Sequence, residues 1–220
     1  MEVYAARQPI FDRNMNLYGY ELLYRKSINN YYEGIDDKQA TAELINNAFL
    51  VIQLNDLTDG TKAFINFSEE LLVKEIPLLL PKEGIVVEVL EWVKPTANVI
   101  QACKNLKENG YILALDDFVF DGEYPPLVEI ADIIKVEYPA VDPDKQRQMI
   151  KQYKRQYSLK FQAEKIETRE EHRTALALGY DFFQGYFFSK PVIVKGEEIG
   201  GLRTSIIQIV NELNNDPIIK

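Results

Sequence analysis

The sequence predicts an α/β fold, a (β/α)8 TIM-like barrel whose first strand runs antiparallel to the others. Short β-rich apolar runs alternate with helical segments along most of the 220 residues, which is typical of parallel βαβ units. The first two runs are separated by a turn around Asp12-Arg13-Asn14, so we expect them to form a hairpin. Several later runs stop at a carboxylate, which is typical of strand ends that meet at one barrel mouth.

The N-terminal half opens with the hairpin and continues with helices and strands in alternation. Near-helical spacing of apolar residues predicts the first helix, Ser68 is placed to cap the second, and Asn109-Gly110 is a stop signal for the third. The expected elements are strands at 3–6 and 18–24, a helix at 36–54, a strand at 62–66, a helix from Glu69, a strand at 84–90 and a helix at 96–108.

The C-terminal half keeps the same alternation after a loop at 119–126 that contains glycine and two prolines. Thr168 and Glu171 have the spacing of a capping box, and Gly179 ends the helix that they begin. The expected elements are a strand at 111–115, a short helix after the loop, a strand at 133–136, a polar helix at 144–157, a strand at 159–163, a helix at 168–178 and a strand at 182–188.

The barrel domain is expected at 1–200, with a separate C-terminal helix at 201–220. That tail is amphipathic, because Ile206, Ile209, Val210 and Leu213 lie on one side. It has no strand of its own, so it is a candidate lid or a candidate linker to a domain missing from this chain.

The composition limits the classes of function and the kind of metal site. A formal net charge of −9 argues against a broad basic face, and so against binding long nucleic acid. Cys103 is the single cysteine, no apolar run is long enough to span a membrane, and the first residues lack a signal-peptide layout, so we expect a cytoplasmic protein. His172 is the single histidine and is expected on the solvated surface. A metal would therefore be held by oxygens, which favours Mg²⁺ or Mn²⁺.

Each candidate site residue has an ordinary structural explanation when it is taken alone. A pair such as Asp116-Asp117 often begins a loop, Asn66 after an apolar run often begins a turn, and Lys135 resembles a lysine at a strand end whose stem is buried. The order and spacing of the whole set carry the functional argument.

Eight landmarks occur in order between residues 3 and 191. They are Gln8-Pro9-Ile10, Gly19-Tyr20-Glu21-Leu22-Leu23-Tyr24-Arg25, Phe64-Ile65-Asn66-Phe67-Ser68, Glu88 with Glu91, Asp116-Asp117-Phe118, Lys135, Ala163-Glu164 with Glu167-Thr168, and Gln184-Gly185-Tyr186-Phe187-Phe188-Ser189-Lys190-Pro191. Together they resemble the motifs of the EAL family, bacterial phosphodiesterases that open cyclic di-GMP to a linear dinucleotide.

The resemblance implies a role for each landmark. Glu21, Asn66, Glu88 and Asp116 would hold one divalent ion, with Asp116, Asp117 and Glu164 near a second. Lys135 would orient or help to deprotonate the attacking water, or neutralise charge, beside Glu164 and Glu21 as catalytic residues. Arg25 would grip a ligand phosphate, Gln8 and Gln184 would place ligand and water, and Glu91 would anchor a loop. The implied partners are cyclic di-GMP and a second copy of the chain.

The chain also departs from the family pattern. Leu22 replaces the middle alanine of the signature, and the loop at 119–126 lacks the first glycine and both serines of the family's loop. Glu137 stands where the family has aspartate, and Lys165 where it has glycine, a residue that is suited to a positive φ angle. None of these changes replaces a residue assigned to the first metal site, so we expect that site to be intact. We expect the second metal site to be weakened.

Three functions are therefore open. The first is a signalling domain that binds cyclic di-GMP while hydrolysis to linear pGpG is weak or lost. The second is a fully active phosphodiesterase, and the third is a non-catalytic scaffold for a protein partner. The N-terminal segment most resembles proteins that join an EAL domain to an HDOD domain, and this favours a signalling scaffold.

Overall fold

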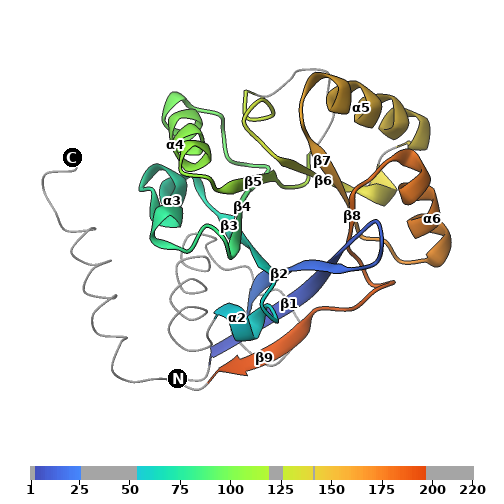
Figure 1. The fold of residues 1–220 in the computed structure, drawn as a ribbon, viewed down its shortest axis with the longest axis horizontal. Helices are drawn as coiled ribbons and strands as arrows, with labels where there is room; N and C mark the ends of the chain where they lie inside the picture. The colour runs from blue at the N-terminus through green and yellow to red at the C-terminus, as the bar shows by residue number, and fades with distance from the viewer. Residues whose placement is uncertain (1–2, 26–53, 119–125, 141, 197–220) are drawn as a thin grey trace, which may run out of the picture.

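The fold is a closed barrel of eight strands with helices on its outside (Figure 1). A computed structural model describes residues 3–25, 54–118, 126–140 and 142–196. The barrel strands are β1 (Val3–Asp12), β2 (Leu17–Arg25), β3 (Lys62–Phe67), β4 (Ile85–Val89), β5 (Ile112–Leu115), β6 (Ile133–Glu137), β7 (Lys160–Glu164) and β8 (Phe182–Phe183). The predicted barrel is confirmed.

The strand directions also agree with the prediction. Strands β2 to β8 are parallel neighbours in chain order. Strand β1 pairs antiparallel with β2 on one side and with β8 on the other, which closes the barrel. A further strand, β9 (Val192–Gly196), pairs antiparallel with the N-terminal part of β1 and was not predicted.

The helices lie outside the ring of strands, and their ends follow the local capping signals (Figure 1). They are α2 (Leu54–Leu57), α3 (Glu69–Val73), α4 (Ala97–Glu108), α5 (Pro143–Gln156) and α6 (Arg169–Leu178), with 3-10 turns η1 (Ile76–Leu79) and η2 (Tyr138–Ala140). Thr168 and Glu171 form the predicted capping box of α6, and Gly179 ends that helix at φ 105°.

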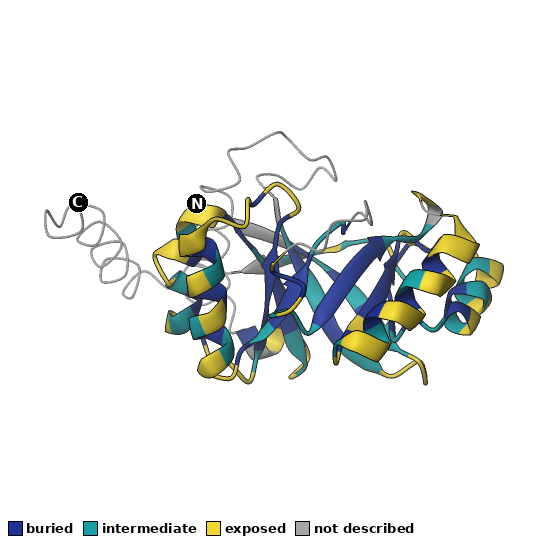
Figure 2. Ribbon diagram, turned by 90° about the horizontal axis from the view of Figure 1, so that it is seen from above, coloured by how far each residue is buried: buried dark blue, intermediate teal, exposed yellow. Residues whose placement is uncertain are grey.

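Two apolar clusters hold the barrel together. The larger one fills the space between the strands and the surrounding helices, and it includes the buried Cys103 of α4, as expected. The smaller one lies inside the barrel and takes its side chains from six strands: Ile10, Phe64, Val86, Ala114, Ile133 and Phe182. Figure 2 shows the strands buried between exposed outer helix faces. The closed end of the barrel is thus packed with apolar side chains.

Several elements differ from the sequence prediction. Strand β1 is longer than 3–6, and β8 is shorter than 182–188, because the chain turns at Gly185. Ser68 occupies the N-cap of α3, but its side chain makes no capping hydrogen bond. Residues 126–130 form turns rather than a helix. The predicted helix at 36–54 lies outside the described residues except for its last residue, and the tail at 201–220 lies wholly outside them.

His172 is partly buried against aromatic side chains, whereas the sequence predicted a solvated surface residue. Its ring packs edge-on against Phe183 and Phe188 and parallel to Phe187. Removal from water lowers the pKa of His172. The helix period explains the position, since His172 is one turn before Ala175 and Leu176 on the inner face of α6.

Among the described helices, none has the length and apolar content needed to cross a membrane.

Candidate metal and ligand site

The candidate site is a layer of polar side chains directly above the inner apolar cluster. Because side chains alternate along a strand, residues two positions apart point to the same face. An inward apolar residue is followed two positions later by a polar one in the pairs Phe64 and Asn66, Val86 and Glu88, Ala114 and Asp116, Ile133 and Lys135, and Phe182 and Gln184. Strand β1 runs the other way, so its polar residue, Gln8, comes two positions before Ile10.

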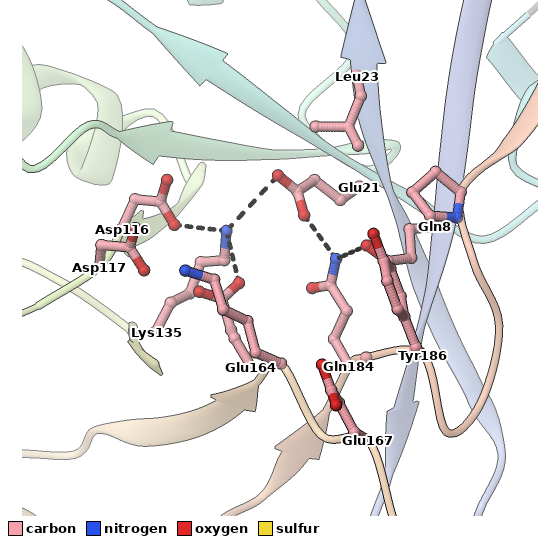
Figure 3. A pocket seen from close by; sticks show the side chains of 13 residues that line it. Gln8, Glu21, Leu23, Asp116, Asp117, Lys135, Glu164, Glu167, Gln184 and Tyr186 are labelled. Carbon is pink, nitrogen blue, oxygen red and sulfur yellow. Dashed lines mark hydrogen bonds and ion pairs between the residues drawn. The ribbon is translucent and has the colours of Figure 1, made fainter. Parts of the chain in front are cut away.

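Lys135 occupies the middle of this layer (Figure 3). Its side chain is 1% exposed, and its Nζ lies 2.6 Å from Asp116 Oδ1, 2.7 Å from Glu88 Oε1, 3.0 Å from Glu164 Oε1 and 3.9 Å from Glu21 Oε1. Burial by itself would lower the pKa of Lys135, but the surrounding carboxylates outweigh it and raise the pKa well above its ordinary value. In the ion-free site this lysine keeps its proton and acts as a counter-charge.

Glutamine side chains connect the acidic residues on the other side of the layer. Gln184 donates to Glu21 Oε2 at 2.5 Å and to Gln8 Oε1 at 3.1 Å (Figure 3). Gln162 donates to Gln184 Oε1 at 2.7 Å and to Glu164 Oε1 at 3.2 Å. Because all three glutamines are buried, this hydrogen-bond network holds the side chains of Glu21 and Glu164 in fixed orientations.

The donor set suits a hard divalent cation. Asn66 Oδ1, Glu88 Oε2 and Asp117 Oδ1 are buried oxygens that meet no hydrogen-bond donor within the described ranges. Carboxylate oxygens of Asp116, Asp117 and Glu164 lie within 4.8 Å of one another. One buried lysine cannot neutralise this many carboxylates, and unpaired buried oxygens are the ligands that Mg²⁺ and Mn²⁺ prefer. The residues present therefore fit the metal that the resemblance implies.

Burial also changes the protonation of the acidic residues. It raises the pKa of Glu88 well above its ordinary value, against the opposing effect of Lys135. It raises the pKa of Glu164 to about 8, again against Lys135. The pKa of Asp117 is raised by burial and then by the neighbouring Asp116. A cation that enters this site would therefore displace protons.

A cavity of about 410 Å³ opens above the layer, within the size range of small-molecule sites. Its lining combines the polar layer with residues from the loops after β7 and β8: Gln8, Glu21, Leu23, Asp116, Asp117, Lys135, Glu164, Lys165, Glu167, Gln184, Gly185, Tyr186 and Pro191. Gly185 allows the close approach of these loops. A Cβ at that position would lie 2.2 Å from the backbone oxygen of Ile166, so no larger residue fits.

Two residues of the cavity wall have strained backbones. Asp117 has a φ of 39° and Lys165 a φ of 56°, in the left-handed region that non-glycine residues rarely adopt. The glycine-to-lysine departure at residue 165 therefore keeps the conformation suited to glycine and places a long cationic side chain there. Strain of this kind is concentrated at functional sites.

The predicted site residues mostly converge. Gln8, Glu21, Asp116, Asp117, Lys135, Glu164 and Gln184 all line the cavity. Glu88 lies beneath it, and Asn66 pairs with Glu88 in the β3–β4 register. Glu91 is exposed beyond the end of β4 and is not among the lining residues, while the side chain of Arg25, at the end of β2, lies outside the described part. The catalytic, metal and ligand roles of all these residues stay predictions.

Sequence reasoning missed three features of this site. Gln162 precedes Glu164 by two positions on β7, and this inward alternation could have identified it. The sequence analysis considered Lys165 only as a replacement for glycine, but its charged side chain also lines the cavity. Tyr186 lines the cavity with 58% of its surface exposed, and Lys190 lies 5.5 Å from its ring centre.

Carboxylate and amide oxygens gathered at the carboxyl ends of parallel strands place this chain among the α/β barrels whose polar site lies at that face. The EAL domain model matches residues 2–191, so this chain belongs to the EAL domain family. This match confirms the resemblance to the EAL family that the sequence motifs indicated. The additional resemblance to EAL–HDOD proteins stays a prediction.

Comparison with other proteins gives relatives of the same family. The chain is 39% identical over 226 residues to the uncharacterized protein YuxH of Bacillus subtilis, covering 100% of this chain and 55% of that protein. It is 38% identical over 212 residues to the cyclic di-GMP phosphodiesterase CdgJ of Vibrio cholerae, covering 96% and 49%. The chain spans about half the length of these relatives. Among solved structures, Klebsiella pneumoniae BlrP1 in a complex with manganese and cyclic di-GMP superposes with a TM-score of 0.70 at 20% identity, covering 89% of this chain and 60% of BlrP1, which shows a shared fold.

Proposed function

We propose that this domain binds cyclic di-GMP at the barrel mouth in a metal-dependent manner and opens it to linear pGpG slowly. The observation that carries the proposal is the gathering of Glu21, Glu88, Asp116 and Glu164 around Lys135, with unpaired oxygens beside them. The relative CdgJ, named as a cyclic di-GMP phosphodiesterase, supports the substrate.

In this proposal Glu21, Asn66, Glu88 and Asp116 hold one divalent ion, and Asp116, Asp117 and Glu164 surround a second position. When bound, such ions activate a water and stabilise negative charge on a phosphodiester. Lys135 supplies positive charge and a proton-bearing ammonium to the same region. Gln184 and Gln162 keep Glu21 and Glu164 oriented, so the acidic layer is pre-organised before ligand enters.

A fully active phosphodiesterase is the second candidate, and the complete acidic layer favours it. We expect slow turnover because Lys165 and Glu137, the two residues that depart from the family pattern here, pair with each other beside the second ion position. The altered loop at 119–126, which was predicted to hinder closure, lies outside the described residues except for Pro126. A scaffold role, an HDOD partner and a homodimer stay predictions.

Calorimetric titration with cyclic di-GMP tests the ligand. Ca²⁺ is used in place of Mn²⁺ to slow hydrolysis, and EDTA gives the ion-free reference. We expect saturable binding that requires the ion, and Arg25→Ala should weaken it at least about tenfold, because arginine binds phosphate through a planar fork. The matched control is Arg147→Ala, which removes an exposed arginine from α5. Absence of binding with Ca²⁺, and again in a repeat with Mn²⁺, would refute the proposal and favour the scaffold.

A further inference from the structure

Lys165 has an unusual position beside the proposed second ion. It directly follows Glu164, the last residue of β7, and its side chain lines the cavity with 55% of its surface exposed. Its φ of 56° costs conformational energy in any residue with a side chain. Such a residue persists where the surrounding structure holds it, and this position is on the wall of the candidate site.

Glu137 holds the ammonium of Lys165 in place. The Nζ of Lys165 lies 2.6 Å from Glu137 Oε2. Glu137 ends β6 and lies opposite Glu164 in the β6–β7 register, so the pair bridges the ends of two adjacent strands. Because both side chains are more than a third exposed, the pair contributes little to folding, and stability alone does not account for the strained backbone.

The charge of Lys165 acts on the outer acidic residues. Lys165 lines the same cavity as Asp116, Asp117 and Glu164, whose carboxylate oxygens lie within 4.8 Å of one another. A positive charge beside these carboxylates repels a cation that they would bind. The acidic trio of Asp116, Asp117 and Glu164 thus shares its cavity with a buried lysine, Lys135, and a half-exposed one, Lys165.

We propose that Lys165, a positive charge that its ion pair with Glu137 only partly offsets, weakens the binding of a second divalent ion at Asp117. The inference rests on the proposed function and deepens it. The site then holds one ion firmly, at Glu21, Asn66, Glu88 and Asp116, and a second one poorly. The charge of Lys165 thus sets the affinity for the second ion, and its side chain does not touch the reacting atoms.

Titration of the full chain with Mn²⁺ tests the inference without any measurement of activity. The electron paramagnetic resonance signal of free Mn²⁺ reports how many ions bind and how tightly. Lys165→Met removes the charge but keeps a side chain at the same φ, and it should tighten the second ion by on the order of tenfold, as expected for a unit charge near a divalent ion. Lys165→Arg keeps the charge and should reproduce the unmodified isotherm.

Glu137→Gln provides a change of the opposite sign. It removes a negative charge and frees the ammonium to turn toward Asp117, so the second ion should bind more weakly than in the unmodified chain. If the pair only tied two strand ends together, both Lys165→Met and Glu137→Gln would change ion binding in the same direction. The matched control is Lys190→Met, which removes an exposed lysine near the same mouth and should leave the isotherm unchanged.

The outcomes separate this inference from the proposed function. Tight binding of a first ion, with a second ion unaffected by Lys165→Met, overturns the inference alone. An equal effect of Lys165→Met and Lys190→Met also overturns it, because the change would then come from net charge. Failure of the unmodified chain to bind any Mn²⁺ overturns both. Thermal melts of each variant establish that the compared proteins are folded.

Discussion

Lys135 Nζ lies 2.7 Å from Glu88 Oε1, and the two side chains are 1% and 0% exposed. The pair joins β4 to β6 across the inside of the barrel, directly above the apolar cluster that closes the other end. Removing charges from water is costly, so this arrangement is retained where a function requires charge at that depth. The barrel interior is therefore organised around one buried cation and several acidic partners.

Removal of Lys135 should destabilise the ion-free protein strongly. Lys135→Met leaves Glu88, Asp116 and Glu164 without their shared cation, and we expect the free energy of unfolding to fall by about 3 to 5 kcal/mol. Urea unfolding in EDTA measures the change. The control is Lys154→Met, which breaks a partly exposed pair with Asp181 and should cost about 1 kcal/mol or less. Equal losses in the two variants would contradict this account of the layer.

Divalent ions should stabilise the folded chain. An ion that binds only to the native state raises the free energy of unfolding by about 2.7 kcal/mol at a hundred times its dissociation constant. Thermal melts with millimolar Mn²⁺ or Mg²⁺ measure the shift. Glu88→Gln should reduce it, whereas Glu108→Gln, the same change on the exposed end of α4, should not. Melting temperatures that do not respond to ions in any of the three proteins would rule out a metal site.

Without an ion, stability should fall as the pH rises from about 4.5 to about 8. In the unfolded chain Glu164 loses its proton near 4.5, whereas burial raises its pKa to about 8 in the folded chain. The native state holds the extra proton between these values, so the free energy of unfolding decreases across that window. Glu88, whose pKa is raised for the same reason, adds a slope of the same sign.

Urea unfolding in EDTA at several pH values measures that slope. Glu164→Gln should flatten it, and Glu108→Gln should leave it unchanged. Saturating Mn²⁺ should also reduce the slope, because the ion binds the deprotonated carboxylates. A stability that increases with pH over this range in EDTA would contradict the burial of a protonated Glu164.

Gly185 should not tolerate a side chain. In Gly185→Ala the new Cβ would overlap the backbone of Ile166 and would also be strained at a φ of 150°, so we expect a loss of about 3 kcal/mol or more. The control is Gly60→Ala, where φ is 74° but nothing lies within 4 Å, and about 1 kcal/mol of backbone strain is expected. Chemical unfolding compares the two, and similar losses would show that the loop after β8 can move away from Ile166.

The barrel and its polar layer were predictable because each strand carries its own local pattern. An inward apolar residue and a polar residue two positions later, such as Ile133 and Lys135, are visible in the chain without its neighbours. Strand β9 was missed although Val192, Ile193 and Val194 form a β-branched run, because that run is short and its pairing with β1, at the other end of the sequence, decides its structure.

The remaining features of the site depend on contacts between distant residues. Gln162 became a site residue through its hydrogen bonds to Glu164 and Gln184, and His172 packs against phenylalanines that lie in the next segment. The pairing of Lys165 with Glu137 joins two departures from the family pattern that are far apart in the sequence. Such relationships arise from folding, and no local periodicity reveals them.

The most direct test of the central claim is the rate at which the unmodified protein converts cyclic di-GMP to linear pGpG with saturating Mn²⁺. Chromatography of the nucleotides over time measures product, and Glu21→Gln provides the background. The account predicts metal-dependent product at less than about one turnover per second, below the usual enzyme range of about 1 to 10³ per second. A turnover within that range would contradict the weakened second ion position and establish a fully active phosphodiesterase.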